Sequence, residues 1–176
     1  MKLTWFGGTT LRVYVGGEIV VVDAAGAPAG IDRGELLAGA DRAVTIGADT
    51  SVPAIDPATW RPKLAPRGID DVPPVDVFRI GDAALLVAAA GEPPLVILGP
   101  GVSPRFGRWA DGAVVILTSG SVPIVAIATV LLDVARPRLI ALAADEQTLD
   151  TAIAELSEHL DGAGLASLEP GLAIEV

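Results

Sequence analysis

Short runs of apolar residues, separated by glycine and proline, recur along the chain and predict a structure built mainly of β-strands. Val20–Val22 is continuous and β-branched, which is typical of a strand buried on both faces. Gly16-Gly17 predicts a two-residue turn that joins Leu11–Val15 and Glu18–Asp23 into a hairpin. The other predicted strands are Lys2–Phe6, Ala43–Ile46, Val75–Ile80, Ala84–Ala90, Leu95–Leu98, Val114–Leu117, Leu139–Leu142 and Leu172–Val176.

Three segments have the pattern of helices. Asp32 is expected to N-cap a short helix that ends at Leu37, and Pro123–Ala135 is expected to form a largely buried helix. Glu146–Leu160 has the clearest helical periodicity, and Gly162 is a suitable C-cap. Its apolar face consists of four residues: Leu149, Ile153, Leu156 and Leu160.

No linker divides the chain, so we expect a single domain over residues 1–176 with two stacked sheets covered by helices. Residues Thr50–Pro74 contain six prolines and little periodicity. They predict a long irregular crossover, a kind of segment that is often functional.

Composition narrows the possible classes of protein. The chain has 176 residues, of which 51% are hydrophobic, enough for a sizeable core and incompatible with disorder. A net charge of −10 disfavours nucleic acid as a partner. The absence of cysteine excludes disulfides and thiolate metal sites.

The uncharged run Gly112–Leu132 is long enough to suggest a membrane span. Thr118–Pro123 interrupts it with residues typical of turns, so we predict a buried strand followed by a buried helix. The first ten residues lack the apolar region of a signal peptide. We therefore expect a cytoplasmic protein that has no membrane contact.

Six segments are informative when they are taken in order: MKLTWFGGTT, GGEIVVVDAAG, ADRAVTIGADTSVP, LVILGPG, ARPRLIALAAD and LEPGLAIEV. Together they resemble the metallo-β-lactamase superfamily, and its ascorbate-phosphate lactonase-like branch in particular. The resemblance covers nearly the whole chain and implies an α+β fold, a shortened four-layer αββα sandwich. It also implies a site for two zinc or manganese ions, held by about five histidines and two aspartates.

The ligand positions of that family are occupied here by residues without metal-binding side chains, apart from one threonine. The resemblance maps them to Gly8, Ala48, Thr50, Val52, Pro53, Pro100 and Ala144. The chain has a single histidine, whereas such ions need several imidazole and carboxylate ligands. We therefore expect neither a bound metal nor another cofactor, and none of the family's catalytic residues.

A few polar residues could still form a residual pocket: Asp23, Asp49, Thr50, Ser119 and Asp145. Asp23 alternatively serves as a turn acceptor for the backbone of Ala24–Gly26. Asp23, Asp49 and Asp145 could instead provide an all-oxygen site for Mg²⁺ or Ca²⁺. Ser119 and Ser121 are candidate nucleophiles, although no Gly-x-Ser-x-Gly motif surrounds them.

Other polar and aromatic residues have both a structural and a functional interpretation. His159 follows Glu155 by four residues, as in an exposed helical pair. Trp60 and Trp109 belong either to the core or to an interface. The nearby cations could line an anion site or be solvated singly: Arg61, Lys63, Arg67, Arg105 and Arg108.

Together these features predict a catalytically inert, metal-free protein with a binding or assembly role, as a homo-oligomer or with a protein partner. One alternative is a hydrolase or lactonase that uses a carboxylate or serine in the cleft where the family holds its metal ions. Another is a small-molecule sensor in which Thr50–Pro74 acts as a lid.

Overall fold

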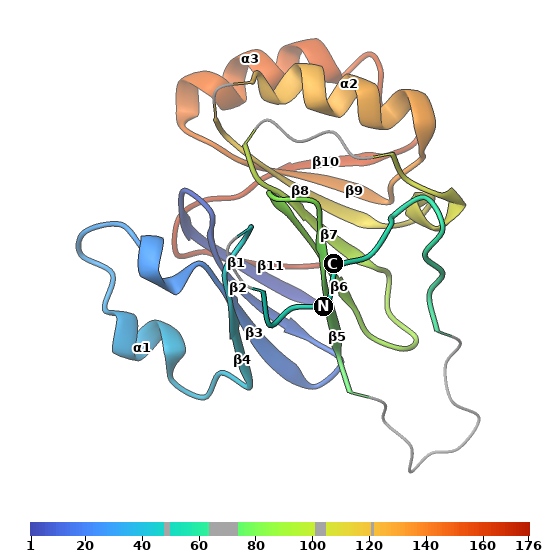
Figure 1. The fold of residues 1–176 in the computed structure, drawn as a ribbon. Coiled ribbons are helices and arrows are strands. Elements are labelled where there is room, and N and C mark those ends of the chain that lie inside the picture. The colour runs from blue at the N-terminus through green and yellow to red at the C-terminus, as the bar shows by residue number, and fades with distance from the viewer. Residues whose placement is uncertain (48–49, 64–73, 101–104, 121) are drawn as a thin grey trace.

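The computed structural model describes residues 1–47, 50–63, 74–100, 105–120 and 122–176 (Figure 1). A five-stranded sheet consists of β1 (Lys2–Gly7), β2 (Thr10–Val15), β3 (Glu18–Val22), β4 (Arg42–Val44) and β11 (Ala173–Glu175). A six-stranded sheet consists of β5 (Asp76–Ile80), β6 (Ala84–Ala88), β7 (Leu95–Leu98), β8 (Val114–Thr118), β9 (Leu139–Ala143) and β10 (Gly164–Ser167). The helices are α1 (Arg33–Leu37), α2 (Ile124–Val134) and α3 (Glu146–Leu156).

The directions of the strands bring the carboxyl ends of many of them to one edge of the molecule. The strand orders are β11-β1-β2-β3-β4 and β10-β9-β8-β7-β6-β5, with β7 to β10 mutually parallel. β1, β3 and β4 share one direction within the first sheet. A parallel bridge between Trp5 and Pro170 aligns β1 with the chain that leaves β10. The carboxyl ends of these strands therefore form a single edge, which we call the carboxyl edge.

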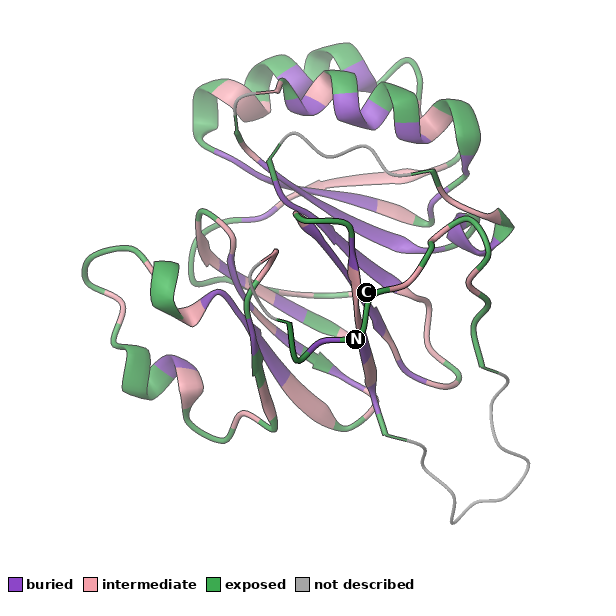
Figure 2. Cartoon of the chain, in the orientation of Figure 1, coloured by how far each residue is buried: buried purple, intermediate pink, exposed green. Residues whose placement is uncertain are grey.

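The two sheets pack against each other through a shared apolar core. Alternate residues of β1 and β2, such as Leu3 and Val13, point inward, because side chains alternate between the faces of a strand. They meet Leu85, Ile97 and Ile116 from the six-stranded sheet. Figure 2 shows these buried segments where the sheets face each other.

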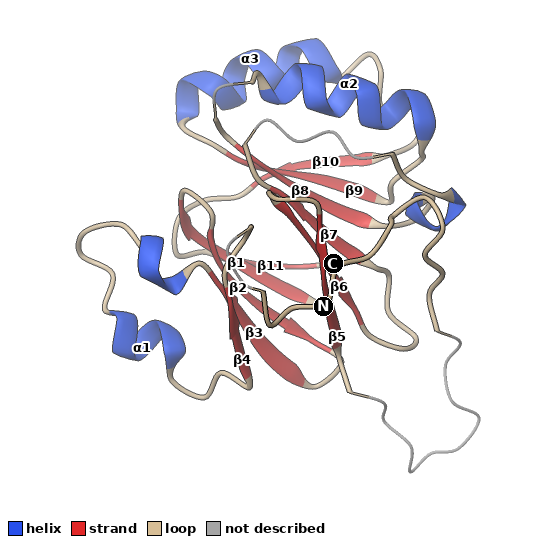
Figure 3. Cartoon of the chain, viewed as in Figure 1, coloured by secondary structure: helices blue, strands red, loops and turns tan. Residues whose placement is uncertain are grey.

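A second core lies on the opposite face of the six-stranded sheet, beneath α2 and α3 (Figure 3). α2 contributes Ile127 and Leu131, and α3 contributes Ala152 and Leu156. Because both faces of the six-stranded sheet are covered, all five residues of β8 are buried. This arrangement explains the unbroken apolar sequence of that strand.

The outer face of the five-stranded sheet is covered differently. Among the described residues, α1 and a short 3₁₀ turn (Ala24–Gly26) are the helical elements next to it. The Arg12 guanidinium donates to the carbonyls of Leu36 and Ala38, both at 2.8 Å, and so ties the end of α1 to β2. The expectation of an α+β fold with two sheets is confirmed, whereas the outer fourth layer is limited to these short segments.

The run Gly112–Leu132 divides into β8 and α2, as the turn residues predicted. No helix in the described part of the chain combines the length and apolar character needed to cross a bilayer.

Near the C-terminus the structure corrects two expectations. The helix predicted for Glu146–Leu160 ends at Leu156, because the amide of His159 donates to the carbonyl of Leu156 at 2.8 Å and closes a turn. The short strand β10 was not predicted at all. It pairs in parallel with β9 and forms an edge of the six-stranded sheet.

The strand predicted for Ala43–Ile46 is shorter than expected. β4 ends at Val44, and the amide of Ile46 donates to the Asp23 carboxylate instead of to a neighbouring strand. The described part of the expected crossover, residues 50–63 and 74, is irregular, and Ala54 forms a parallel bridge with Arg79 of β5. Residues 64–73 of that crossover lie outside the described residues.

Replacing Arg12 with methionine should lower the free energy of unfolding by about 1–2 kcal/mol, because the carbonyls at the end of α1 lose charged donors while the apolar stem is retained. Urea denaturation measures the change. Hydrogen exchange should also accelerate selectively in residues 33–38. Arg138→Met, at an exposed arginine, is the matched control, and equal losses in the two variants would contradict a specific role for Arg12.

Candidate functional site

A pocket of about 660 Å³ opens at the carboxyl edge; we call it the edge pocket. Its walls come from the end of β1 with the following turn, the end of β8, the end of β9 with the first turn of α3, and the residues that follow β10. Gly8, Ser119, Ala144 and Asp145 are among the lining residues. A volume of this size suits a small molecule.

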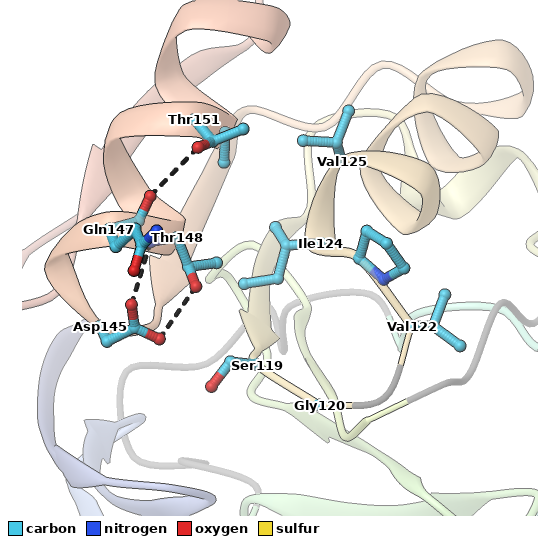
Figure 4. A pocket seen from close by; sticks show the side chains of 11 residues that line it. Ser119, Gly120, Val122, Ile124, Val125, Asp145, Gln147, Thr148 and Thr151 are labelled. Atoms are coloured by element: carbon cyan, nitrogen blue, oxygen red, sulfur yellow. Dashed lines mark hydrogen bonds between the residues drawn. The ribbon is translucent and has the colours of Figure 1, made fainter.

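A second pocket of about 570 Å³ lies between the N-terminal ends of α2 and α3; we call it the interhelical pocket. Figure 4 shows Ile124 and Val125 of α2 on one side, and Asp145, Thr148 and Thr151 on the other. Ser119 and Asp145 line both pockets. The structure therefore brings together two of the residues that sequence analysis proposed for a residual pocket.

Asp145 is already engaged in a structural role. One carboxylate oxygen accepts from the amide of Thr148 at 3.0 Å, and the other accepts from the Thr148 hydroxyl at 2.9 Å. This is the N-cap of α3. The hydrogen bonds to the backbone and side chain of Thr148 lower the pKa of Asp145. A carboxylate with a lowered pKa is a weak general base.

Among the described residues, no hydrogen bond joins the Ser119 hydroxyl to a base, although Asp145 lines the same pockets. Its backbone amide donates to the carbonyl of Ala143 at 3.1 Å and fixes the residue at the end of β8. His159 lies beyond the far end of α3, where Nδ1 contacts the carbonyl oxygen of Glu155 at 3.0 Å. Ser119 and His159 therefore do not form a catalytic pair. Ser121 lies outside the described residues.

Asp23 is buried and lines neither the edge pocket nor the interhelical pocket. Its carboxylate accepts from the amide of Ile46 at 2.9 Å, and its own amide donates to the carbonyl of Val44 at 2.9 Å. The hydroxyl of Thr10 donates to its backbone carbonyl at 3.0 Å. The side chain of Asp23 thus accepts from the chain after β4 and forms no cap bond to Ala24–Gly26. In that turn it is the backbone carbonyl of Asp23 that accepts, from the amide of Gly26 at 2.9 Å.

The positions that the resemblance maps to metal ligands do not converge on one pocket. Gly8 and Ala144 both line the edge pocket. Pro100 packs close to Gly120, where a Cβ would collide with the proline ring. In contrast, Val52 and Pro53 line a separate pocket beside β4 and β5.

Thr50 is exposed and lines neither the edge pocket nor the interhelical pocket. Ala48 and Asp49 lie outside the described residues. In the described ranges, no three His, Cys, Asp or Glu side chains are grouped so that they could hold a metal ion. An all-oxygen cation site at Asp23 and Asp145 is thus not supported, because the two carboxylates have separate structural partners.

The cations of the proposed anion site are dispersed. Lys63 pairs with Asp76 at 2.6 Å, and Arg61 donates to the carbonyl of Trp60 at 2.9 Å. Arg105 and Arg108 are exposed, and Arg67 lies outside the described residues.

The tryptophans belong to a packed aromatic group. The rings of Trp60 and Trp109 lie 4.8 Å apart in an edge-to-face arrangement, which is favourable for aromatic pairs. Trp109 is buried, and its indole N–H donates to the carbonyl of Pro57 at 2.6 Å. Trp109 therefore belongs to the core, and Trp60 is a half-buried residue that packs against it.

Sequence analysis missed the side of the edge pocket that follows β10. Ser167, Leu168 and Glu169 belong to it. The available signal was the short segment Gly164–Leu168, which follows a glycine-containing turn. Its four strand residues show no clear alternation and are only partly buried, so periodicity alone did not distinguish them from a loop.

Comparisons of the chain with protein-family models, with curated proteins and with solved structures found no match. The case for a function therefore depends on the residues themselves.

Asp23→Ala should lower the free energy of unfolding by about 1–3 kcal/mol, because the amide of Ile46 loses its acceptor in a largely buried site. The backbone of Asp23 is left-handed, with φ of 50°, a conformation that Asn also tolerates. Asp23→Asn keeps an acceptor oxygen and should therefore lose much less stability. Thermal and urea unfolding provide the comparison, and equal losses would contradict the assigned role.

Asp145→Ala should destabilise the protein at neutral pH, since the N-cap of α3 is lost. The folded pKa of Asp145 is lowered, so its contribution is fully present above the unfolded pKa of about 3.9 and disappears as the pH falls through the folded value. The stability difference between the wild type and the variant should thus shrink in acid. Unfolding curves at a series of pH values test this, and a difference independent of pH would refute it.

Proposed function

We propose that the chain is a metal-free binding protein on a shortened metallo-β-lactamase-like sandwich, catalytically inert as a hydrolase. Its binding site is the edge pocket. The observation that carries the proposal is the wall of this pocket. Gly8 and Ala144, at two positions where the resemblance expects histidine, line a cavity of about 660 Å³ and offer no side-chain donor atom.

The arrangement of strands is consistent with this proposal. Two sheets face each other, and the carboxyl ends of their strands form the carboxyl edge. In α/β architectures, ligands commonly bind at the carboxyl ends of strands. The pocket remains open and has not been filled by large side chains. An open pocket in which the described carboxylates are not grouped as metal ligands supports molecular recognition more than metal-dependent hydrolysis.

A second candidate function, serine- or carboxylate-dependent hydrolysis, is favoured by one observation: Ser119 and Asp145 line the same two pockets. The chemistry argues against it. Asp145 accepts two hydrogen bonds from Thr148, and its lowered pKa makes it a poor base for the Ser119 hydroxyl. The sensor alternative gains no support at these two pockets, because the described part of the proposed lid, residues 50–63 and 74, lines neither of them.

Metal uptake and hydrolysis provide the main test. After treatment with a chelator, titration with Zn²⁺ and with Mn²⁺ should show no stoichiometric binding. Hydrolysis of p-nitrophenyl acetate and of a simple lactone should be equally slow in the wild type and in Ser119→Ala. Stoichiometric metal uptake, or an activity that Ser119→Ala abolishes, would overturn the proposal.

Assembly is a separate part of the proposed role, and light scattering tests it. Val130 and Val134 are exposed on α2, where a second chain could cover them. A larger assembly would show that the chain acts as an oligomer. A monomer at all concentrations would remove homo-oligomerisation and leave recognition at the edge pocket.

A further inference from the structure

The floor of the edge pocket is apolar. Trp5 and Leu168 are buried, and Leu149 adds a partly exposed aliphatic wall. The indole N–H of Trp5 donates to the carbonyl of Gly8 at 3.0 Å, so its hydrogen-bonding capacity is already used. A hydrocarbon group placed here would contact apolar surface and displace water, which favours binding.

The charges of the pocket are all negative. Asp145, Glu146 and Glu169 line it, and none of the described residues that line it is a lysine, arginine or histidine. Asp145 is held by the N-cap, whereas the Glu146 and Glu169 carboxylates form no ion pair or hydrogen bond with the described residues. The α3 N-terminus contributes about half a positive charge, which is less than the two carboxylates at residues 145 and 146. In a concave site, charges of one sign concentrate the field and attract the opposite charge.

The arrangement of the carboxylates indicates which kind of cation the pocket binds, a metal ion or an organic cation. An inner-sphere metal ion needs several oxygens within about 2.0–2.6 Å, and the described residues provide no such group. An ammonium or guanidinium group instead binds exposed carboxylates through longer, charge-assisted hydrogen bonds. It can also carry a hydrocarbon chain into the apolar floor.

We infer that the edge pocket binds an organic cation with an apolar body, such as an alkylamine. This inference rests on the proposed binding function and specifies its class of ligand. The ammonium group lies at the rim between Glu146 and Glu169, and the alkyl chain extends toward Trp5, Leu149 and Leu168. Organic anions of the same shape are excluded by repulsion from the three carboxylates of the pocket.

Calorimetric titration with n-hexylamine, hexanoate and hexanol tests the inference. Hexylamine should bind about tenfold more tightly than hexanoate, with hexanol between them. Added salt should weaken amine binding. Lengthening the amine by one methylene should tighten binding by up to about fourfold, the value for complete burial of that group. Equal binding of the amine and the carboxylate would overturn the assignment of charge.

Two double variants test whether the amine binds in the edge pocket. The double variant Glu146→Gln and Glu169→Gln should strongly reduce the preference for the amine, while the affinity for hexanol stays unchanged. Glu155→Gln with Glu158→Gln removes two carboxylates that do not line the pocket, so it should leave amine affinity unchanged. Equal losses in the two double variants would refute the site, since they would indicate a general effect of net charge.

Failure of this inference is distinguishable from failure of the proposed function. Absence of amine binding overturns the assigned ligand class, and the metal and hydrolysis experiments still decide whether the chain is inert. Stoichiometric uptake of Zn²⁺ or Mn²⁺ would overturn the proposed function directly, whatever the amine does.

Discussion

Burial of the six-stranded sheet on both faces is the constraint on which the rest of the structure depends. One face packs against the five-stranded sheet, and the other packs against α2 and α3. β8 crosses the middle of this arrangement with every residue buried, and the hydroxyl of Thr118 donates to the carbonyl of Leu98 at 3.0 Å. The carboxyl edge of this sheet exists because the parallel strands that share this double coverage end together. Its side chains come from turns that the core holds in place.

Much of the fold was predictable because it follows from local patterns. The Gly16-Gly17 hairpin has positive φ at both glycines, as the predicted turn requires. Asp32 caps α1 through the amides of Gly34 and Glu35, and the helix ends at Leu37 as expected. What escaped prediction was decided by distant partners. β10 forms because β9 offers a parallel edge, and β4 ends early because the amide of Ile46 donates to the Asp23 carboxylate.

The candidate site was predictable only in part, for a related reason. Ser119 and Asp145 follow strands that were recognised, and parallel pairing brings these strand ends together. Asp23 was correctly treated as a possible structural acceptor, but its partner lies 23 residues away in the chain. Glu169 could not be assigned to the pocket without β10. The pocket is a property of strand order, which single-sequence periodicity does not encode.

The bridge between Ala54 and Arg79 affects how readily the edge of the six-stranded sheet can pair with another chain. β5 is an outer strand of its sheet, and such strands present free backbone groups that can template pairing with another chain. Here the carbonyl and the amide of Arg79 are both engaged, by Ile55 and Pro53. Pro53 and Pro57 lack an N–H, so the covering segment is itself a poor template. The edge of β5 is therefore covered at Arg79 against pairing with a strand of another chain.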